Sequence, residues 1–147
     1  MDEKETENFI KLLYQIHKAE WEATPSTKQA TTWLFDLFEF LFPNNSSNKL
    51  SIYGGHLKKN QIDLENLLLS YLDPKELAIE EAISSFYAAL EEIYQSLRLD
   101  AAKIYENDPA AVSIHEVIVS YPGFYAIAVY RIAHQLSQLS ILFCHVF

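Results

Sequence analysis

Glycine and proline are scarce in this sequence of 147 residues, which contains three glycines and five prolines. A sandwich or barrel of many short strands needs a turn between each pair, so this scarcity favours long helices. The single cysteine, Cys144, excludes an internal disulfide bond and a zinc site with the usual four ligands. No segment has the roughly 18–20 consecutive apolar residues that a membrane-spanning helix requires.

Basic residues are also few, because 11 Lys and Arg stand against 20 Asp and Glu, giving a formal net charge of −9. Proteins that bind nucleic acids neutralise phosphates with Lys and Arg, and binding to anionic lipids uses the same residues. The charge therefore argues against nucleic-acid and membrane partners. The sequence starts with MDEKETENF, which is charged and unlike a secretory signal, so we expect a cytoplasmic protein.

Apolar residues make up 50% of the chain and aromatic residues 14%, which is enough for a hydrophobic core. They recur at steps of three and four, the spacing of one helix face, and no stretch alternates as a strand does. We therefore predict an all-α fold, a compact bundle of six to eight helices in a single domain, residues 1–147. The helices are expected at residues 8–23, 31–42, 62–72, 74–97, 101–106, 109–120 and 124–139, and residues 43–59 are expected to be irregular.

Residues 31–42, TTWLFDLFEFLF, are apolar around nearly the full circumference of a helix. A helix of this kind must be buried on most sides. It has no Lys or Arg for a lipid surface, so packing against other helices or a second subunit is a better interpretation than a membrane anchor. Residues 140–147 are also apolar and without protecting charge, and we expect the chain to self-associate.

Metal and phosphate motifs are weak in this sequence. The five histidines are scattered, and none has a second histidine four residues away, as a zinc-binding helix requires. Gly54-Gly55 is too short for a phosphate loop and lacks a following Lys-Ser/Thr, so loop flexibility explains the pair better. The sequence therefore predicts no metal site. Asp108, followed by Pro109, is either a helix N-cap or a carboxylate that belongs to a binding site.

Residues 108–134 read DPAAVSIHEVIVSYPGFYAIAVYRIAH. This stretch resembles the end of the N-terminal helical domain of serine O-acetyltransferases, which contains three linked motifs at these separations. The motifs are Asp-Pro-Ala at residues 108–110, Tyr-Pro-Gly-Phe at residues 121–124 and Tyr-Arg-Ile-Ala-His at residues 130–134. The helices before residue 108 are similar to that domain only in being helical.

The resemblance implies a role in the transfer of an acetyl group from acetyl-CoA to L-serine, a step of cysteine biosynthesis. In the family the helical domain mediates assembly into trimers or hexamers. A following β-helix holds acetyl-CoA and the histidine that acts as general base. The Asp-Pro-Ala motif lends a carboxylate to the serine site, which implies that Asp108 is a substrate-binding residue. A carboxylate suits this role because it pairs with the ammonium group of serine.

The same resemblance assigns no catalytic, cofactor-binding or metal-binding residue to this chain. We expect structural roles for Arg131 and His134, and the alternative is that both lie near the serine pocket of the full enzyme. Family sequences continue into hexapeptide repeats, and these 147 residues contain none. We therefore expect a fragment of the enzyme that is inactive alone, with residues 140–147 as a truncated or non-native tail. The alternative is a stand-alone helical oligomerisation or adaptor module without catalysis.

Overall fold

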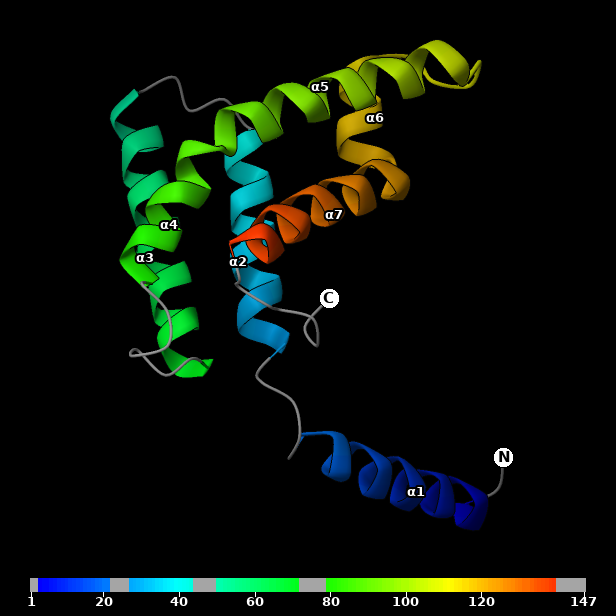
Figure 1. Ribbon diagram of the computed structural model, residues 1–147. Coiled ribbons are helices and arrows are strands. Elements are labelled where there is room, and N and C mark those ends of the chain that lie inside the picture. The colour runs from blue at the N-terminus through cyan, green and yellow to red at the C-terminus, as the bar shows by residue number, and fades with distance from the viewer. Residues whose placement is uncertain (1–2, 22–26, 44–49, 72–78, 140–147) are drawn as a thin grey trace.

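The computed structural model describes residues 3–21, 27–43, 50–71 and 79–139, and the regular secondary structure in these ranges is entirely helical. Figure 1 shows α2, α3 and α4 side by side, α5 and α7 running across their direction, and α6 joining one end of α5 to α7. The all-α prediction is confirmed. The helices are α1 (Glu3–Trp21), α2 (Thr27–Leu41), α3 (Leu50–Tyr71), α4 (Ile79–Ala88), α5 (Leu90–Asn107), α6 (Ile114–Ser120) and α7 (Pro122–Gln138).

The first group of helices, α2 to α4, shares one apolar interior. Trp33 and Leu37 of α2 meet Leu64 and Leu68 of α3, and all four side chains are at most 2% exposed. Phe86 of α4 completes this interior, with its ring centroid 5.8 Å from that of Trp33. Spacings of four residues place these side chains on one face of each helix. Burial of each is worth roughly 1.5–3 kcal/mol relative to exposure, so this interior contributes substantially to stability.

The second group, α5 to α7, has its own buried row. Leu97 and Ala101 of α5, Val117 of α6, and Ile132 and Leu136 of α7 are all fully buried. The four-residue spacing within α5 and again within α7 turns one stripe of each helix towards the other. The connection from α5 through α6 back to α7 is therefore held in place by packing at both ends.

Five aromatic rings join the two groups. Phe42, just after α2, lies 5.4 Å from the ring of Tyr94 on α5 and 5.5 Å from that of Phe124 on α7. Phe38 meets Tyr125 edge to face at 5.0 Å. Such pairs add about 0.5–1.5 kcal/mol each beyond the area they bury. The aromatic segment 31–42 therefore packs against the other helices through part of its circumference, while Phe35 is 49% exposed, and its last turn fixes where α7 begins.

Helix α1 extends away from the other helices in Figure 1. It is amphipathic, and Phe9, Leu12 and Ile16 on its apolar face are 50%, 53% and 46% exposed. Helical periodicity predicts that a face prefers burial, but it does not say which surface covers that face. Within the described residues this face of α1 is open.

The prediction of irregular structure over residues 43–59 is wrong from Leu50 onward, because α3 begins there and includes Gly54 and Gly55. Each glycine costs a helix about 1 kcal/mol relative to alanine. Both face open space, because beyond the adjacent residues and the local helix backbone no atom lies within 4 Å of the position that a Cβ would occupy on either one, so no packing is lost at them. Burial of Leu64 and Leu68 further along the same helix outweighs this cost.

Two further boundaries also differ from the predictions. The helix expected over residues 74–97 is interrupted at Ala89, whose N–H is shared between the carbonyls of Ser85 and Phe86. The separate helix expected at residues 101–106 is wrong, because α5 continues through Asp100. The start of the helix expected at residues 74–97 and the tail at residues 140–147 lie outside the described residues.

Candidate functional site

Asp108 lies where α5 ends and the irregular connection to α6 begins. Its N–H donates to the carbonyl of Ile104 at 3.0 Å, which completes the last turn of α5. Its backbone is extended, with φ −109° and ψ 104°. The following Pro109 disfavours helical backbone at the residue before it, so the sequence ends the helix here. The carbonyl of Asp108 then accepts the N–H of Ala111 at 3.1 Å, which closes a turn.

The Asp108 carboxylate is held at both oxygens. Oδ1 accepts the N–H of Ala110 at 2.9 Å, and Oδ2 accepts the hydroxyl of Tyr121 at 2.9 Å. The side chain is only half-buried. A carboxylate offers about four acceptor positions, and these two bonds use two of them. Asp108 is therefore an oriented anion that still has acceptor positions to offer to a cation.

Helix α6 begins later than the sequence predicted, at Ile114 and not at Pro109. Ser113 Oγ accepts the N–H of Glu116 at 3.1 Å, and Glu116 Oε2 accepts the N–H of Val112 at 2.7 Å. This is a variant of the reciprocal capping box, which satisfies two backbone donors at a helix start. The Ser-x-x-Glu pattern is the stronger N-terminal signal, so Ser113 and not Asp108 is the N-cap of α6.

Tyr121 is the N-cap of α7, and Pro122 occupies the first helical position. The Tyr121 N–H donates to the carbonyl of Val117 at 3.3 Å, and the Tyr121 carbonyl accepts the N–H of Phe124 at 3.0 Å. Because Phe124 is fully buried in the aromatic cluster, its hydrogen bond to Tyr121 fixes the position of the Tyr121 backbone. The hydrogen bond to Asp108, followed by partial desolvation, raises the pKa of the Tyr121 phenol above its ordinary value.

Arg131 ties α7 to α5. Its Nε and Nη2 donate to the two carboxylate oxygens of Asp100, at 2.6 and 3.0 Å, and this pairing raises the pKa of the guanidinium. A two-point fork of this kind fixes both distance and orientation. This contact agrees with the structural role predicted for Arg131, and the role itself stays a prediction. His134 is exposed and stacks on Tyr130 of its own helix, with ring centroids 5.9 Å apart, and its Nε2 lies 3.1 Å from Gln138 Nε2.

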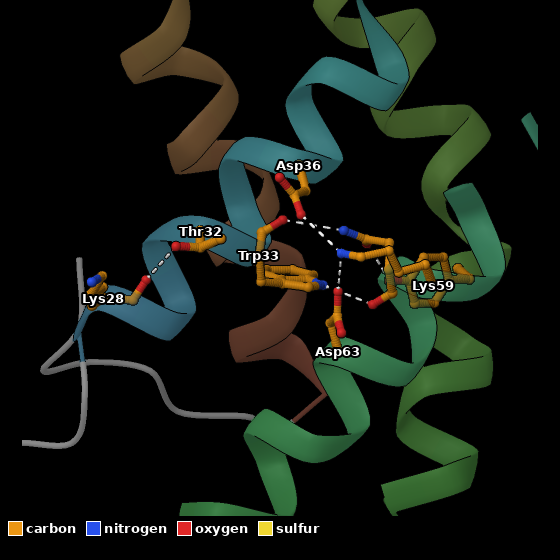
Figure 2. Close-up of polar contacts among 8 residues, drawn as sticks. Lys28, Thr32, Trp33, Asp36, Lys59 and Asp63 are labelled. Atoms are coloured by element: carbon orange, nitrogen blue, oxygen red, sulfur yellow. Dashed lines mark hydrogen bonds and ion pairs between the residues drawn. The ribbon is translucent and has the colours of Figure 1, made fainter. Parts of the chain in front are cut away.

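A second candidate is an open cavity of about 440 Å³ between α2 and α3. Figure 2 shows Lys59 reaching between Asp36 and Asp63, with Nζ at 3.2 and 2.7 Å from their carboxylates. These hydrogen bonds raise the pKa of Lys59. The cavity is lined by Lys28, Gln29, Thr32, Trp33, Asp36, Lys59, Asp63, Asn66, Leu67 and Ser70.

The charged side chains around this cavity balance, because two lysines face two aspartates. Behind Lys59, the buried Asn60 donates from Nδ2 to the carbonyl of Trp33 at 3.2 Å and accepts the Tyr87 hydroxyl at 2.5 Å. The Trp33 indole N–H donates back to the Asn60 carbonyl at 3.1 Å. No buried side-chain polar atom of the described residues lacks a partner. These contacts hold α2, α3 and α4 together, and the site at Asp108 is the stronger candidate.

The described residues contain no group of three or more His, Cys, Asp and Glu placed to hold a metal ion. Across the same ranges, no helix has both the length and the apolar character needed to cross a membrane. Candidate chemistry in the described structure therefore centres on the Asp108 carboxylate.

Sequence reasoning identified Asp108 but not its partner Tyr121, and it identified Arg131 but not its partner Asp100. Both pairs are long-range, separated by 13 and 31 residues. The motif at residues 121–124 did contain Tyr121, and its linkage to the Asp-Pro-Ala motif was the available signal. Asp100 carried no signal of its own, because an acidic residue after a helical stripe also fits a cap.

A family model, described as the N-terminal region of serine acetyltransferase, matches residues 64–129. The match includes Asp108 and Tyr121 and ends one residue before the motif that starts at Tyr130. The resemblance predicted from residues 108–134 is confirmed for this part of the chain.

Two curated proteins of Synechococcus elongatus are each similar to part of this chain. A plasmid-encoded serine acetyltransferase is 44% identical over 61 residues, which are 42% of this chain and 19% of the relative. A second serine acetyltransferase of that organism is 44% identical over 46 residues, 31% of this chain and 19% of the relative. The aligned part of the chain therefore spans about one fifth of the length of either relative.

Proposed function

We propose that this chain supplies the helical, amino-terminal part of a serine acetyltransferase, and that Asp108 binds the ammonium group of L-serine. The family match over residues 64–129 supports the enzyme class. The observation that carries the residue is the geometry of Asp108, whose two oxygens are held at 2.9 Å from Ala110 N and the Tyr121 hydroxyl while the side chain stays half exposed. An anion oriented in this way can bind and align an ammonium ion.

In the proposed reaction the serine hydroxyl attacks the thioester carbon of acetyl-CoA. A carbon–oxygen bond forms, the carbon–sulfur bond breaks, and the hydroxyl proton ends on the coenzyme A thiol. The attack needs a general base and a binding site for acetyl-CoA. We assign neither to a described residue of this chain, so we expect no turnover from the 147-residue chain alone. A thiol-release assay with acetyl-CoA and L-serine tests this, and turnover by the chain alone would contradict it.

The role of Asp108 is tested in the complete serine acetyltransferase that carries this chain, called the complete enzyme below. Asp108→Asn keeps the size of the side chain and removes the charge. We expect KM for L-serine to rise by about 100-fold, since loss of one partner of a charge-assisted pair costs that order of affinity. KM for acetyl-CoA should change by less than about twofold, because the carboxylate does not interact with that substrate.

Glu106→Gln is the matched control, because it removes one negative charge from an exposed side chain two residues earlier. It should leave both KM values unchanged. Equal effects of Asp108→Asn on the two substrates would contradict the assignment. Hexapeptide repeats encoded downstream of codon 147 would support the enzyme. If no catalytic domain is joined to this chain or assembled with it, the adaptor alternative would be favoured instead.

Self-association is a second part of the proposal, and the exposed apolar face of α1 supports it. Leu12 and Ile16, 53% and 46% exposed, lie on this face, and a second copy of the chain would remove them from water. Leu12→Glu should weaken association, whereas Gln15→Glu adds the same charge on the polar side and should not. Sedimentation of the chain at micromolar concentration measures both, and a strict monomer in the unsubstituted chain would contradict the proposal.

A further inference from the structure

Within the described residues, the Tyr121 hydroxyl is the one hydrogen-bond partner of the Asp108 side chain that is distant in sequence. Ala110, which holds Oδ1, belongs to the same turn as Asp108 and moves with it. Tyr121 belongs to the start of α7 and holds Oδ2 from outside that turn. Two fixed points on different elements define the plane of a carboxylate, whereas one local contact leaves it free to rotate.

We propose that Tyr121 is a positioning residue for the serine site, which holds Asp108 Oδ2 so that the remaining acceptor positions of the carboxylate face the substrate ammonium group. This inference rests on the proposed function of Asp108. Tyr121 acts through Asp108, and its own contact with the substrate is not required.

The backbone around Tyr121 is suited to this task because it is anchored on both sides. The residue caps α7, its N–H donates to Val117 of α6, and its carbonyl accepts the N–H groups of Phe124 and Tyr125 at 3.0 and 3.3 Å. Phe124 is fully buried against Phe42, with ring centroids 5.5 Å apart. The hydroxyl is therefore carried on a rigid base, which is the condition for orienting a second side chain.

The phenol also stays a hydrogen-bond donor under ordinary conditions. Its bond to Asp108 raises the pKa of Tyr121 above the ordinary value of 10.0, so the proton that it donates remains in place at neutral pH. Neither side chain is buried, so the pair is a weak source of stability for the fold. A role in orientation therefore accounts for the contact better than a role in folding.

The contact itself is tested in the 147-residue chain by carbon-13 NMR of its tyrosine Cζ atoms. Asp108→Asn removes the charged acceptor, so the pKa of Tyr121 should fall towards 10.0, while Glu106→Gln should leave it unchanged. The Tyr121 signal is identified by its loss in Tyr121→Phe. An unchanged Tyr121 titration in Asp108→Asn would overturn the proposal, whatever the enzyme assays give.

The function of the contact is tested in the complete enzyme with Tyr121→Phe, which removes only the hydroxyl. We expect kcat/KM for L-serine to fall roughly 3- to 10-fold, the factor that loss of one hydrogen bond gives, and KM for acetyl-CoA to stay within about twofold. Tyr125→Phe is the matched control, because Tyr125 lies four residues further along and its hydroxyl has no hydrogen bond within the described residues. It should leave both substrates unaffected.

The double variant Asp108→Asn with Tyr121→Phe separates positioning from a merely structural role. If Tyr121 acts through Asp108, the double variant is no worse for L-serine than Asp108→Asn alone. Additive losses, or an unaffected Tyr121→Phe beside a strongly impaired Asp108→Asn, would overturn the inference and leave the proposed function standing. An Asp108→Asn enzyme with normal KM for L-serine would overturn the proposed function, and this inference with it.

Discussion

Among the described residues, two tyrosine hydroxyls donate to side-chain oxygens, and the two contacts lie in different surroundings. Tyr87 donates to Asn60, a residue only 3% exposed between α2, α3 and α4. Tyr121 donates to Asp108, which is half exposed at the junction of α5 and α6. Asn60 donates and accepts within the bundle, whereas the Asp108 carboxylate keeps positions free for a cation.

The difference shows that similar hydrogen bonds can have different roles, one in stabilising the fold and the other in orienting a side chain. A buried amide must find partners inside the protein, because an unsatisfied group there costs the full desolvation free energy. A half-exposed carboxylate has water as an alternative partner, so its protein contacts add little to stability and are available to orient it. We therefore expect substitutions around Asn60 to act on folding, and substitutions around Asp108 to act on substrate binding.

The largest effect is expected for Asn60→Ala. The Tyr87 hydroxyl and the Trp33 carbonyl each lose a buried partner, and a small cavity remains. We expect the free energy of unfolding to fall by about 3 kcal/mol. Asn66→Ala, an exposed substitution on the same helix, should stay within about 0.5 kcal/mol. Urea unfolding followed by circular dichroism measures both, and equal losses would remove the contrast between the two regions.

The next effect concerns Tyr87 and alkaline pH. Burial is the main cause that raises the pKa of Tyr87 above its ordinary value of 10.0. The folded chain therefore keeps this proton when the unfolded chain releases it, so the associated stability is complete below about pH 10 and is lost as pH rises above it. The pKa values of Tyr121 and Tyr125 are also raised above the ordinary value.

Tyr87→Phe should therefore lower stability by roughly 1–2 kcal/mol at about pH 8, because Asn60 loses a partner, and should flatten the decline between about pH 9 and pH 11. Urea midpoints across this range give the slope. Exposed Tyr130→Phe is the control and should follow the unsubstituted chain. A Tyr87→Phe chain that loses stability in alkali as steeply as the unsubstituted chain would contradict the assignment.

The packing of the two groups could be predicted from the sequence only in part. Repeats of three and four residues predicted that residues 31–42 and 124–139 are helical, because this spacing follows the helix turn whatever surrounds it. They did not predict which side is buried, since Phe35 is 49% and Tyr130 68% exposed. The last helix was expected from residue 124, but α7 begins at Pro122, whose missing N–H and restricted φ suit a first turn. Gly54 and Gly55 led to a wrong prediction of irregular structure, because glycine favours turns. Both lie within α3, which is stabilised by buried residues further along the helix.

The candidate site was harder to predict than the fold. Asp108 was found through a motif, but its contact with Tyr121 depends on the reversal of direction through α6, which no local pattern reports. The same is true of Arg131 and Asp100, 31 residues apart. The exposed face of α1 is a third case, since amphipathicity predicts a preference for burial and leaves the partner unspecified.

A smaller effect is expected for Arg131→Lys, which keeps the charge and loses the two-point fork to Asp100. The Arg131 and Asp100 side chains are 38% and 21% exposed, so solvent screening reduces the value of the pair. We expect a loss of about 1 kcal/mol in the free energy of unfolding. Arg98→Lys, at an exposed position on α5, should cost nothing measurable. Thermal unfolding compares the two, and indistinguishable midpoints would show that the fork contributes no stability.

The smallest effect on stability is expected at Asp108 itself, and it tests the comparison most directly. Asp108→Asn and Asp100→Asn make the same chemical change in two carboxylates, but only Asp100 neutralises a guanidinium. Asp100→Asn leaves Arg131 without its counter-ion and should cost roughly 1–2 kcal/mol, whereas Asp108→Asn should stay within about 0.5 kcal/mol. Urea unfolding of the two variants provides the comparison. If Asp108→Asn cost as much as Asp100→Asn, Asp108 would be a structural carboxylate like Asp100, and its half-exposed position would no longer support a role in binding serine.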